Sequence, residues 1–112
     1  MSKKLIYEVE RVTITYIKKD PPEYHIEAQG KTKSAGWSDA RLSAVVYVQD
    51  PPDGLYDFNF IAEPPSGESA QELTPVSVHA VLGKMPKSFR GVRVHARSNE
   101  KEAILEGPNN SQ

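Results

Sequence analysis

The sequence predicts an all-β protein: a single-domain antiparallel β-sandwich of immunoglobulin-like architecture with about seven strands. Three Pro-Pro pairs divide the chain, at 21–22, 51–52 and 64–65. Proline fixes φ at about −65° and has no N–H, so each pair interrupts helices and central strands. Between the pairs, apolar and polar residues alternate with the period of a half-buried strand, and no segment carries a helical apolar stripe. A small β-barrel is the alternative architecture.

The N-terminal part of the chain predicts a bent strand followed by a hairpin. Apolar residues alternate with polar ones over residues 5–9 and again, in the opposite phase, over 12–16. This change of phase near residues 10–11 predicts a β-bulge, or a strand that bends between two sheets. Alternation resumes over residues 24–28, after the first Pro-Pro pair, so the two strands are expected to form a hairpin or to be joined by a turn that crosses between sheets.

The middle of the chain predicts a loop, two strands and a tight turn. Residues 30–40 are small and polar apart from Trp37, which is typical of a loop. The run 41–48 is almost continuously apolar toward its end, so we expect a strand buried on both faces. Residues 50–54 combine proline, aspartate and glycine in the pattern of a turn. The clearest alternation in the chain follows over residues 56–62 and predicts a strand.

The C-terminal part begins with a loop over residues 63–72, which are rich in Pro, Ser, Gly and Glu. Three further strands are predicted after it, over residues 76–82, 92–96 and 102–105. The folded domain is expected to span residues 1–106, and residues 107–112 are expected to be a disordered tail.

Composition excludes several classes of function. The 112 residues include 14 basic and 15 acidic side chains, so a net charge of −1 provides no field that would attract nucleic acid or an anionic membrane. The absence of cysteine excludes disulfides and thiolate chemistry. No apolar run approaches the roughly 18 residues of a membrane helix, and the N-terminus does not resemble a signal peptide. We therefore expect a cytoplasmic protein that binds neither nucleic acid nor membrane.

One segment is locally basic. From Lys84 to Arg97 the chain contains no acidic residue, and Arg93 lies in the predicted strand of this segment. The only aromatic residue there is Phe89, whereas binding of single-stranded nucleic acid usually uses interleaved aromatic side chains. A solvated sheet face or an anionic protein partner explains the segment at least as well.

The three histidines are the candidates for metal binding or acid–base chemistry. His25, His79 and His95 each fall on the polar face of a predicted strand. If the strands that carry His79 and His95 pair, their imidazoles share one sheet face, and a zinc site then needs a third ligand. The candidates for that ligand are Glu27, Asp57 and Glu102. Because no metal-ligand spacing or nucleophile motif is present, we expect no cofactor and no enzymatic activity; a small metal protein or enzyme built on His79 and His95 is the competing hypothesis.

The most plausible function is therefore that of a protein-binding module that presents Pro-rich loops at residues 34–41, 50–54 and 63–72. The residues expected to contact a partner are Trp37, Arg41, Pro64, Pro65 and Arg93. Trp37 has a second interpretation, as a plug that closes one end of the sandwich with its ring stacked under Arg41. A protease inhibitor that uses the 63–72 loop is one concrete version of the module.

The oligomeric state is left open between two alternatives. The chain is either a monomer or a dimer formed through an unpaired edge strand, for which residues 5–17 and 92–97 are the candidates.

Three stretches of the chain resemble a pattern found in small uncharacterised bacterial all-β proteins. They are GWSDARL at 36–42, PPDGLYDFNFIAEPP at 51–65 and GVRVHA at 91–96. The resemblance covers roughly residues 28–104. It implies a bacterial origin and a compact β domain, and it brings no established activity and no catalytic residue.

Overall fold

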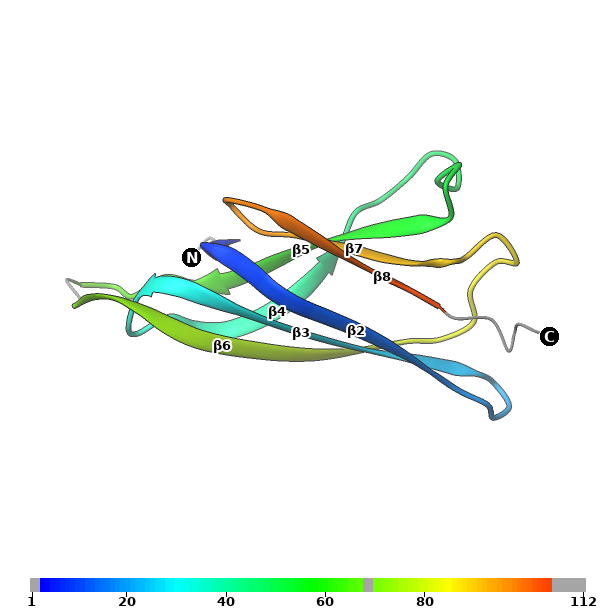
Figure 1. Ribbon diagram of the computed structural model, residues 1–112, viewed down its shortest axis with the longest axis horizontal. Helices are drawn as coiled ribbons and strands as arrows, with labels where there is room; N and C mark the ends of the chain where they lie inside the picture. Colours follow the sequence, from blue (N-terminus) through cyan, green and yellow to red (C-terminus); the bar gives the residue numbers. More distant parts are fainter. Residues whose placement is uncertain (1–2, 68–69, 106–112) are drawn as a thin grey trace.

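Two β-sheets pack face to face in the computed structural model, which describes residues 3–67 and 70–105 (Figure 1). The strands in these residues are β1 (Lys4–Leu5), β2 (Glu8–Ile17), β3 (Glu23–Ser34), β4 (Ser38–Ala44), β5 (Leu55–Glu63), β6 (Gln71–Leu82), β7 (Gly91–His95) and β8 (Glu100–Ile104). The all-β sandwich predicted from the sequence is thus confirmed. The described residues contain no helix, and hence none that is long and apolar enough to cross a membrane. The predicted tail, 107–112, lies outside the described residues.

Strand β5 is the centre of the larger sheet. The larger sheet has the order β1-β5-β7-β8, with β4 also paired to β5, and the smaller sheet has the order β2-β3-β6. Ile61 pairs with both Leu5 and Arg41, so β1 and β4 lie on opposite edges of β5. All pairings are antiparallel except that between β5 and β7, which is parallel. Because the strands described form two separate sheets, the barrel alternative is wrong.

The predicted bulge and hairpin are both confirmed at the start of the smaller sheet. The register between β2 and β3 shifts between Val9 and Arg11, which leaves Glu10 as the extra residue. Gly30 pairs with Val9 at this bulge, where a Cβ atom would overlap the carbonyl oxygen of Glu8. Glycine is therefore required here by the close approach of two backbones.

The loop predicted over residues 30–40 is wrong for most of its length. β3 continues to Ser34 and β4 starts at Ser38, so only three residues connect the two strands. The inward positions of β3 here are Gly30, Thr32 and Ser34, and the last two are only 2% and 8% exposed. The Thr32 hydroxyl donates a hydrogen bond to the Ser34 carbonyl at 2.8 Å, which satisfies it inside the core. Small polar side chains thus occupy the inward position at every second residue here, as apolar side chains do in the other strands.

The strand predicted over residues 41–48 ends early, and its predicted burial is wrong. β4 stops at Ala44, after which Val46 is 93% exposed and Val48 is completely exposed. Residues 45–54, which we call the 45–54 loop, project from the sandwich between β4 and β5, in the upper right of Figure 1.

The core between the sheets is built from the inward side chains of both. Its largest fully buried members are Phe60 of β5, Ile6, which directly follows β1, and Ile26 of β3. Val92 and Val94 of β7 are also completely buried, which places this strand inside the larger sheet between β5 and β8. The prediction that 92–97 is a free edge is therefore wrong, whereas β2, within 5–17, is an edge of the smaller sheet.

Candidate functional site

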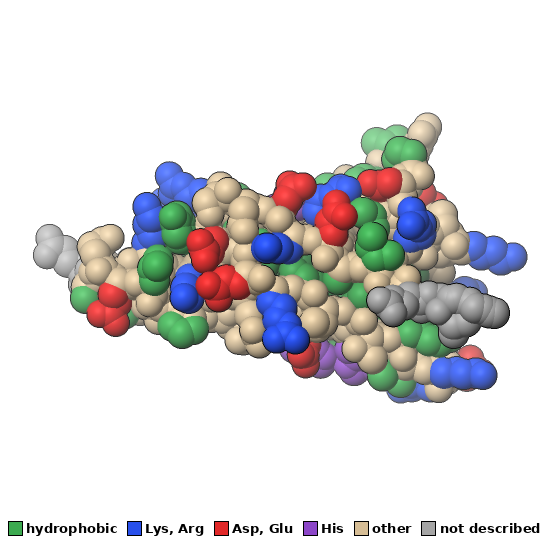
Figure 2. Space-filling view, in the orientation of Figure 1, with side chains coloured by type: hydrophobic (Ala, Val, Ile, Leu, Met, Phe, Trp, Pro, Cys, Tyr) green, Lys and Arg blue, Asp and Glu red, His purple; other side chains and the backbone are tan. Residues whose placement is uncertain are grey.

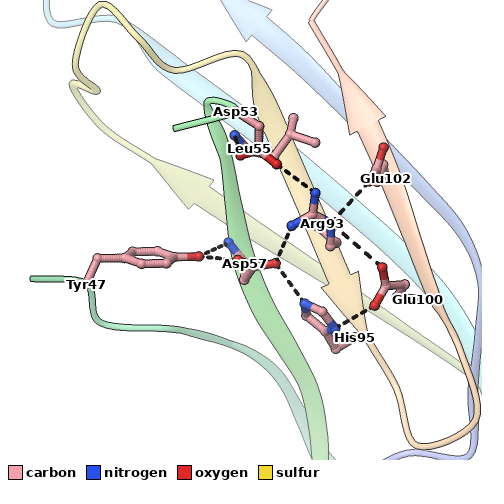
Figure 3. Close-up of polar contacts among 8 residues, drawn as sticks. All are labelled: Tyr47, Asp53, Leu55, Asp57, Arg93, His95, Glu100 and Glu102. Carbon is pink, nitrogen blue, oxygen red and sulfur yellow. Dashed lines mark hydrogen bonds and ion pairs between the residues drawn. The ribbon is translucent and has the colours of Figure 1, made fainter. Parts of the chain in front are cut away.

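A network of charged side chains covers the outer face of β5, β7 and β8, and Arg93 lies at its centre (Figure 3). Its Nη2 is 2.9 Å from Asp53 Oδ2, its Nη1 is 3.1 Å from Asp57 Oδ1, and its Nε is 3.1 Å from Glu102 Oε2. These carboxylates, above all Asp53 and Glu102, raise the pKa of Arg93 beyond its usual value. Every nitrogen of the guanidinium group thus has a carboxylate partner within the protein.

His95 joins two carboxylates of the same network. Its Nε2 is 2.8 Å from Asp57 Oδ1, and its Nδ1 is 3.2 Å from Glu100 Oε1. A neutral imidazole donates only one of these hydrogen bonds, whereas the protonated ring donates both. The ring therefore links β5 to the start of β8.

Asp57 ties the network to the 45–54 loop. The Tyr47 hydroxyl donates a hydrogen bond to Asp57 Oδ2 and accepts one from the Asp57 backbone N–H at 2.9 Å. Partial burial raises the pKa of Asp57, but hydrogen bonds from Tyr47, His95 and Arg93 outweigh it, so the pKa lies below its usual value. Burial, and then the bond to Asp57, raise the pKa of Tyr47.

Further hydrogen bonds fix the backbone of the 45–54 loop. The Val45 N–H donates to the Asp57 carbonyl at 3.0 Å, and the Gly54 N–H donates to the Pro51 carbonyl at 3.1 Å. Asp53 Oδ1 accepts from the Leu55 N–H at 3.0 Å, and Gly54 adopts a φ of 77°, which favours glycine. The predicted turn at 50–54 is confirmed, and the loop is held at both ends and at Tyr47.

The consequence for Val46 and Val48 is that both are exposed to solvent on either side of the anchored Tyr47. Tyr47 between them is half-buried because its hydroxyl is bound to Asp57. Residues of the loop and Arg93 line a shallow groove beside it. The sequence indicated only the turn at 50–54, because an apolar run such as 44–48 looks the same whether it is buried or exposed.

The position of Trp37 agrees with its interpretation as a plug at one end of the sandwich, except that its ring does not stack under Arg41. Its ring is half-buried against the core, and its Nε1 donates to Ser34 Oγ at 3.1 Å. Arg41 is exposed, and its Nε instead contacts Asp39 Oδ1 at 3.3 Å. In the part of the chain that the structure describes, the one cation–π contact joins Lys33 to Tyr7, so the predicted stacking of Trp37 on Arg41 is wrong.

The other predicted partner residues are less available than the sequence indicates. Pro64 and Pro65 are half-buried just after β5, and the guanidinium group of Arg93 already contacts carboxylates of its own network. Residues 68–69 of the predicted 63–72 loop lie outside the described residues, so the use of that loop in protease inhibition stays a prediction.

The predicted meeting of His79 and His95 is wrong. His79 belongs to β6 in the smaller sheet, and His95 belongs to β7 in the larger one, because β6 pairs with β3 rather than with β7. His79 Nε2 instead lies 3.1 Å from His25 Nδ1, whose ring also contacts Glu23 Oε1 through Nε2 at 3.0 Å. The bond from His25, followed by that from Lys19, lowers the pKa of Glu23.

The candidates for a third metal ligand are dispersed. Asp57 and Glu102 belong to the Arg93 network, and Glu27 is exposed on β3 opposite His79. Within residues 3–67 and 70–105, no group of three or more histidine, aspartate or glutamate side chains has an arrangement suited to a metal ion.

Comparisons with protein-family models, with curated proteins and with solved structures found no match for this chain. Function is therefore inferred from the geometry of its own residues.

Proposed function

We propose that the protein is a non-enzymatic binding module that recognises a partner protein through the 45–54 loop. The observation that supports this proposal is the exposure of Val46 and Val48 on a segment that is anchored to β5 by the backbone of Val45 and by the hydroxyl of Tyr47. An apolar side chain on an ordered backbone loses little conformational entropy on binding, and it gains the free energy of leaving water. Full burial of one valine contributes about 1.5–3 kcal/mol.

The chemistry of the loop indicates the kind of partner surface that fits it. The two valines need shallow apolar pockets, and the exposed Asp50 beside them favours a partner with a basic rim. We place this interaction in the cytoplasm, because a chain without cysteine gains nothing from an oxidising compartment.

The Arg93 network supports the loop in this proposal and performs no chemistry. Each nitrogen of Arg93 already contacts a carboxylate, so the positive charge of the group is balanced within the protein. Asp57 orients Tyr47, and Tyr47 in turn sets the direction of the two valines.

Paired variants test the proposal. Replacing both Val46 and Val48 with aspartate is expected to weaken capture of the partner from an extract of the source cells by at least about tenfold, because charged side chains cannot enter apolar pockets. A photo-crosslinking residue placed at position 48 should attach the same partner covalently, as identified by mass spectrometry.

The matched control is Val81→Asp, which alters an exposed valine on β6 in the other sheet. This variant should retain capture at the level of the unaltered protein. If the control and the double variant capture the partner equally, or if no protein crosslinks at position 48, recognition by the 45–54 loop is wrong.

A further inference from the structure

A pocket of about 370 Å³ lies at the end of the sandwich where β1, the end of β3 and the turn between β7 and β8 meet. Its lining consists of Leu5, Tyr7, Lys33, Trp37, Arg97 and Ser98. In Figure 1 this end, marked by the N-terminus and the β7–β8 turn, is opposite the end from which the 45–54 loop projects. The pocket is therefore separate from the surface discussed above.

Hydrogen bonds between distant segments hold the pocket in shape. The Arg97 N–H donates to the Ile6 carbonyl at 2.8 Å, and the Ser98 N–H donates to the Tyr7 carbonyl at 2.9 Å. The Ser98 hydroxyl also donates to the Tyr7 carbonyl, at 2.7 Å. Because the indole of Trp37 is itself fixed, the walls are in place before any ligand enters.

The walls combine aromatic surface with positive charge. Tyr7 and Trp37 are both half-buried, so each presents part of its ring to the pocket. Lys33 Nζ lies 4.7 Å from the centroid of the Tyr7 ring. Lysine and arginine side chains are exposed at this end of the molecule in Figure 2, as others are at the opposite end.

The two cations of the pocket also differ from those of the Arg93 network. Among the residues that the structure describes, neither Lys33 nor Arg97 forms an ion pair within 4.0 Å, whereas Arg93 contacts four carboxylates within that distance. A concave aromatic surface with two such cations attracts an anion that carries an apolar group.

We propose that this pocket binds a carboxylate attached to an aromatic ring. The ring packs against Trp37 and Tyr7, and the carboxylate lies between Lys33 and Arg97, where arginine provides two parallel N–H donors. Two sources carry this chemistry: a free aryl carboxylate, and the C-terminal phenylalanine, tyrosine or tryptophan of a peptide.

Trp37 provides a direct signal, because it is the only tryptophan in the chain. The indole Nε1–H of the ¹⁵N-labelled protein gives one NMR cross-peak, which can be followed while 3-phenylpropionate is added. For a ligand of this size we expect a saturable shift with a Kd of roughly 1 mM or below. The uncharged 3-phenylpropanol should bind at least about tenfold more weakly, since it lacks the carboxylate.

Peptides distinguish the two sources. A short peptide that ends in phenylalanine with a free carboxylate is compared with its C-terminal amide in the same titration. Tighter binding of the free-acid peptide than of 3-phenylpropionate assigns the pocket to chain termini, and the reverse order assigns it to small aryl carboxylates.

Substitutions test the role of the two cations. The double variant with Lys33→Gln and Arg97→Gln should lose at least about tenfold in affinity for 3-phenylpropionate, while Lys84→Gln, at an exposed lysine outside the lining, should not change it. An unchanged Tm and an unchanged pattern of the remaining cross-peaks confirm that the double variant is folded. The proposal is wrong if no saturable shift appears up to about 10 mM ligand, or if the acid and the alcohol bind equally.

Discussion

Replacing Phe60 with alanine is expected to lower the free energy of unfolding by about 3–5 kcal/mol. The Phe60 side chain is completely buried, and it belongs to β5, the strand that pairs with β1, β4 and β7. Its removal leaves a cavity in the middle of the core, which the three neighbouring strands cannot collapse to fill. Urea denaturation followed by circular dichroism measures the change as a lower midpoint at an unchanged slope.

The control for Phe60 is Tyr16→Ala, near the end of β2. Tyr16 is 48% exposed and its ring lies 5.3 Å from that of Tyr24, so its loss removes a peripheral contact. We expect this variant to lose no more than about 1 kcal/mol. Equal losses for the two variants would contradict the position of the core between the sheets.

Replacing Asp57 with alanine is expected to lower the free energy of unfolding by about 1–3 kcal/mol, because half-buried donors lose their charged acceptor. Arg93, His95 and Tyr47 each contact this carboxylate. The same variant should also release Tyr47, which would appear as faster amide hydrogen exchange in the 45–54 loop. Retained protection of that loop would show that Asp57 does not order it.

The pH dependence gives a second readout for Asp57. Its pKa is lower in the folded protein than in the unfolded chain, where aspartate has a pKa of about 3.9. Its contribution is therefore fully present above about pH 4 and is lost as the pH falls through the folded-state value. Between about pH 6 and pH 2, Asp57→Ala should lose less stability than the unaltered protein.

An exposed carboxylate of the other sheet provides the comparison. Glu27→Ala removes a side chain outside the Arg93 network, and its stability should fall with acid as steeply as that of the unaltered protein. Parallel curves for all three proteins would mean that Asp57 contributes nothing to acid sensitivity.

The strands with apolar alternation could be predicted from the sequence, and so could the bulge near Glu10. The end of β3 could not, because its inward residues Thr32 and Ser34 are small and polar, and hydropathy does not separate a buried hydroxyl from a solvated one. The position of Val46 and Val48 was missed for the opposite reason. Valine favours strands and cores, and only the hydrogen bonds of Tyr47 show why both side chains remain in water.

The Arg93 network depends on strand order, which the sequence does not contain. The sequence indicates Asp57 only as a possible metal ligand, and Arg93 only as part of a basic segment and as a residue that contacts a partner. The parallel pairing of β5 with β7 places these two residues opposite each other, although 36 positions separate them. Local patterns carry no information on such a pairing, and for the same reason they matched His79 with the wrong histidine.

The parallel pairing of β5 with β7 also bears on how the chain folds. After β5 the chain crosses into the smaller sheet to form β6, and it returns to the larger sheet only with β7. Asn99 adds a contact across 90 positions, since its side chain bonds both the N–H and the carbonyl of Val9. The strands of the two sheets are therefore interleaved along the chain, and much of the pairing is between distant segments. Such long-range pairing predicts slow folding, on the scale of milliseconds to seconds, with the two sheets lost together in one unfolding transition.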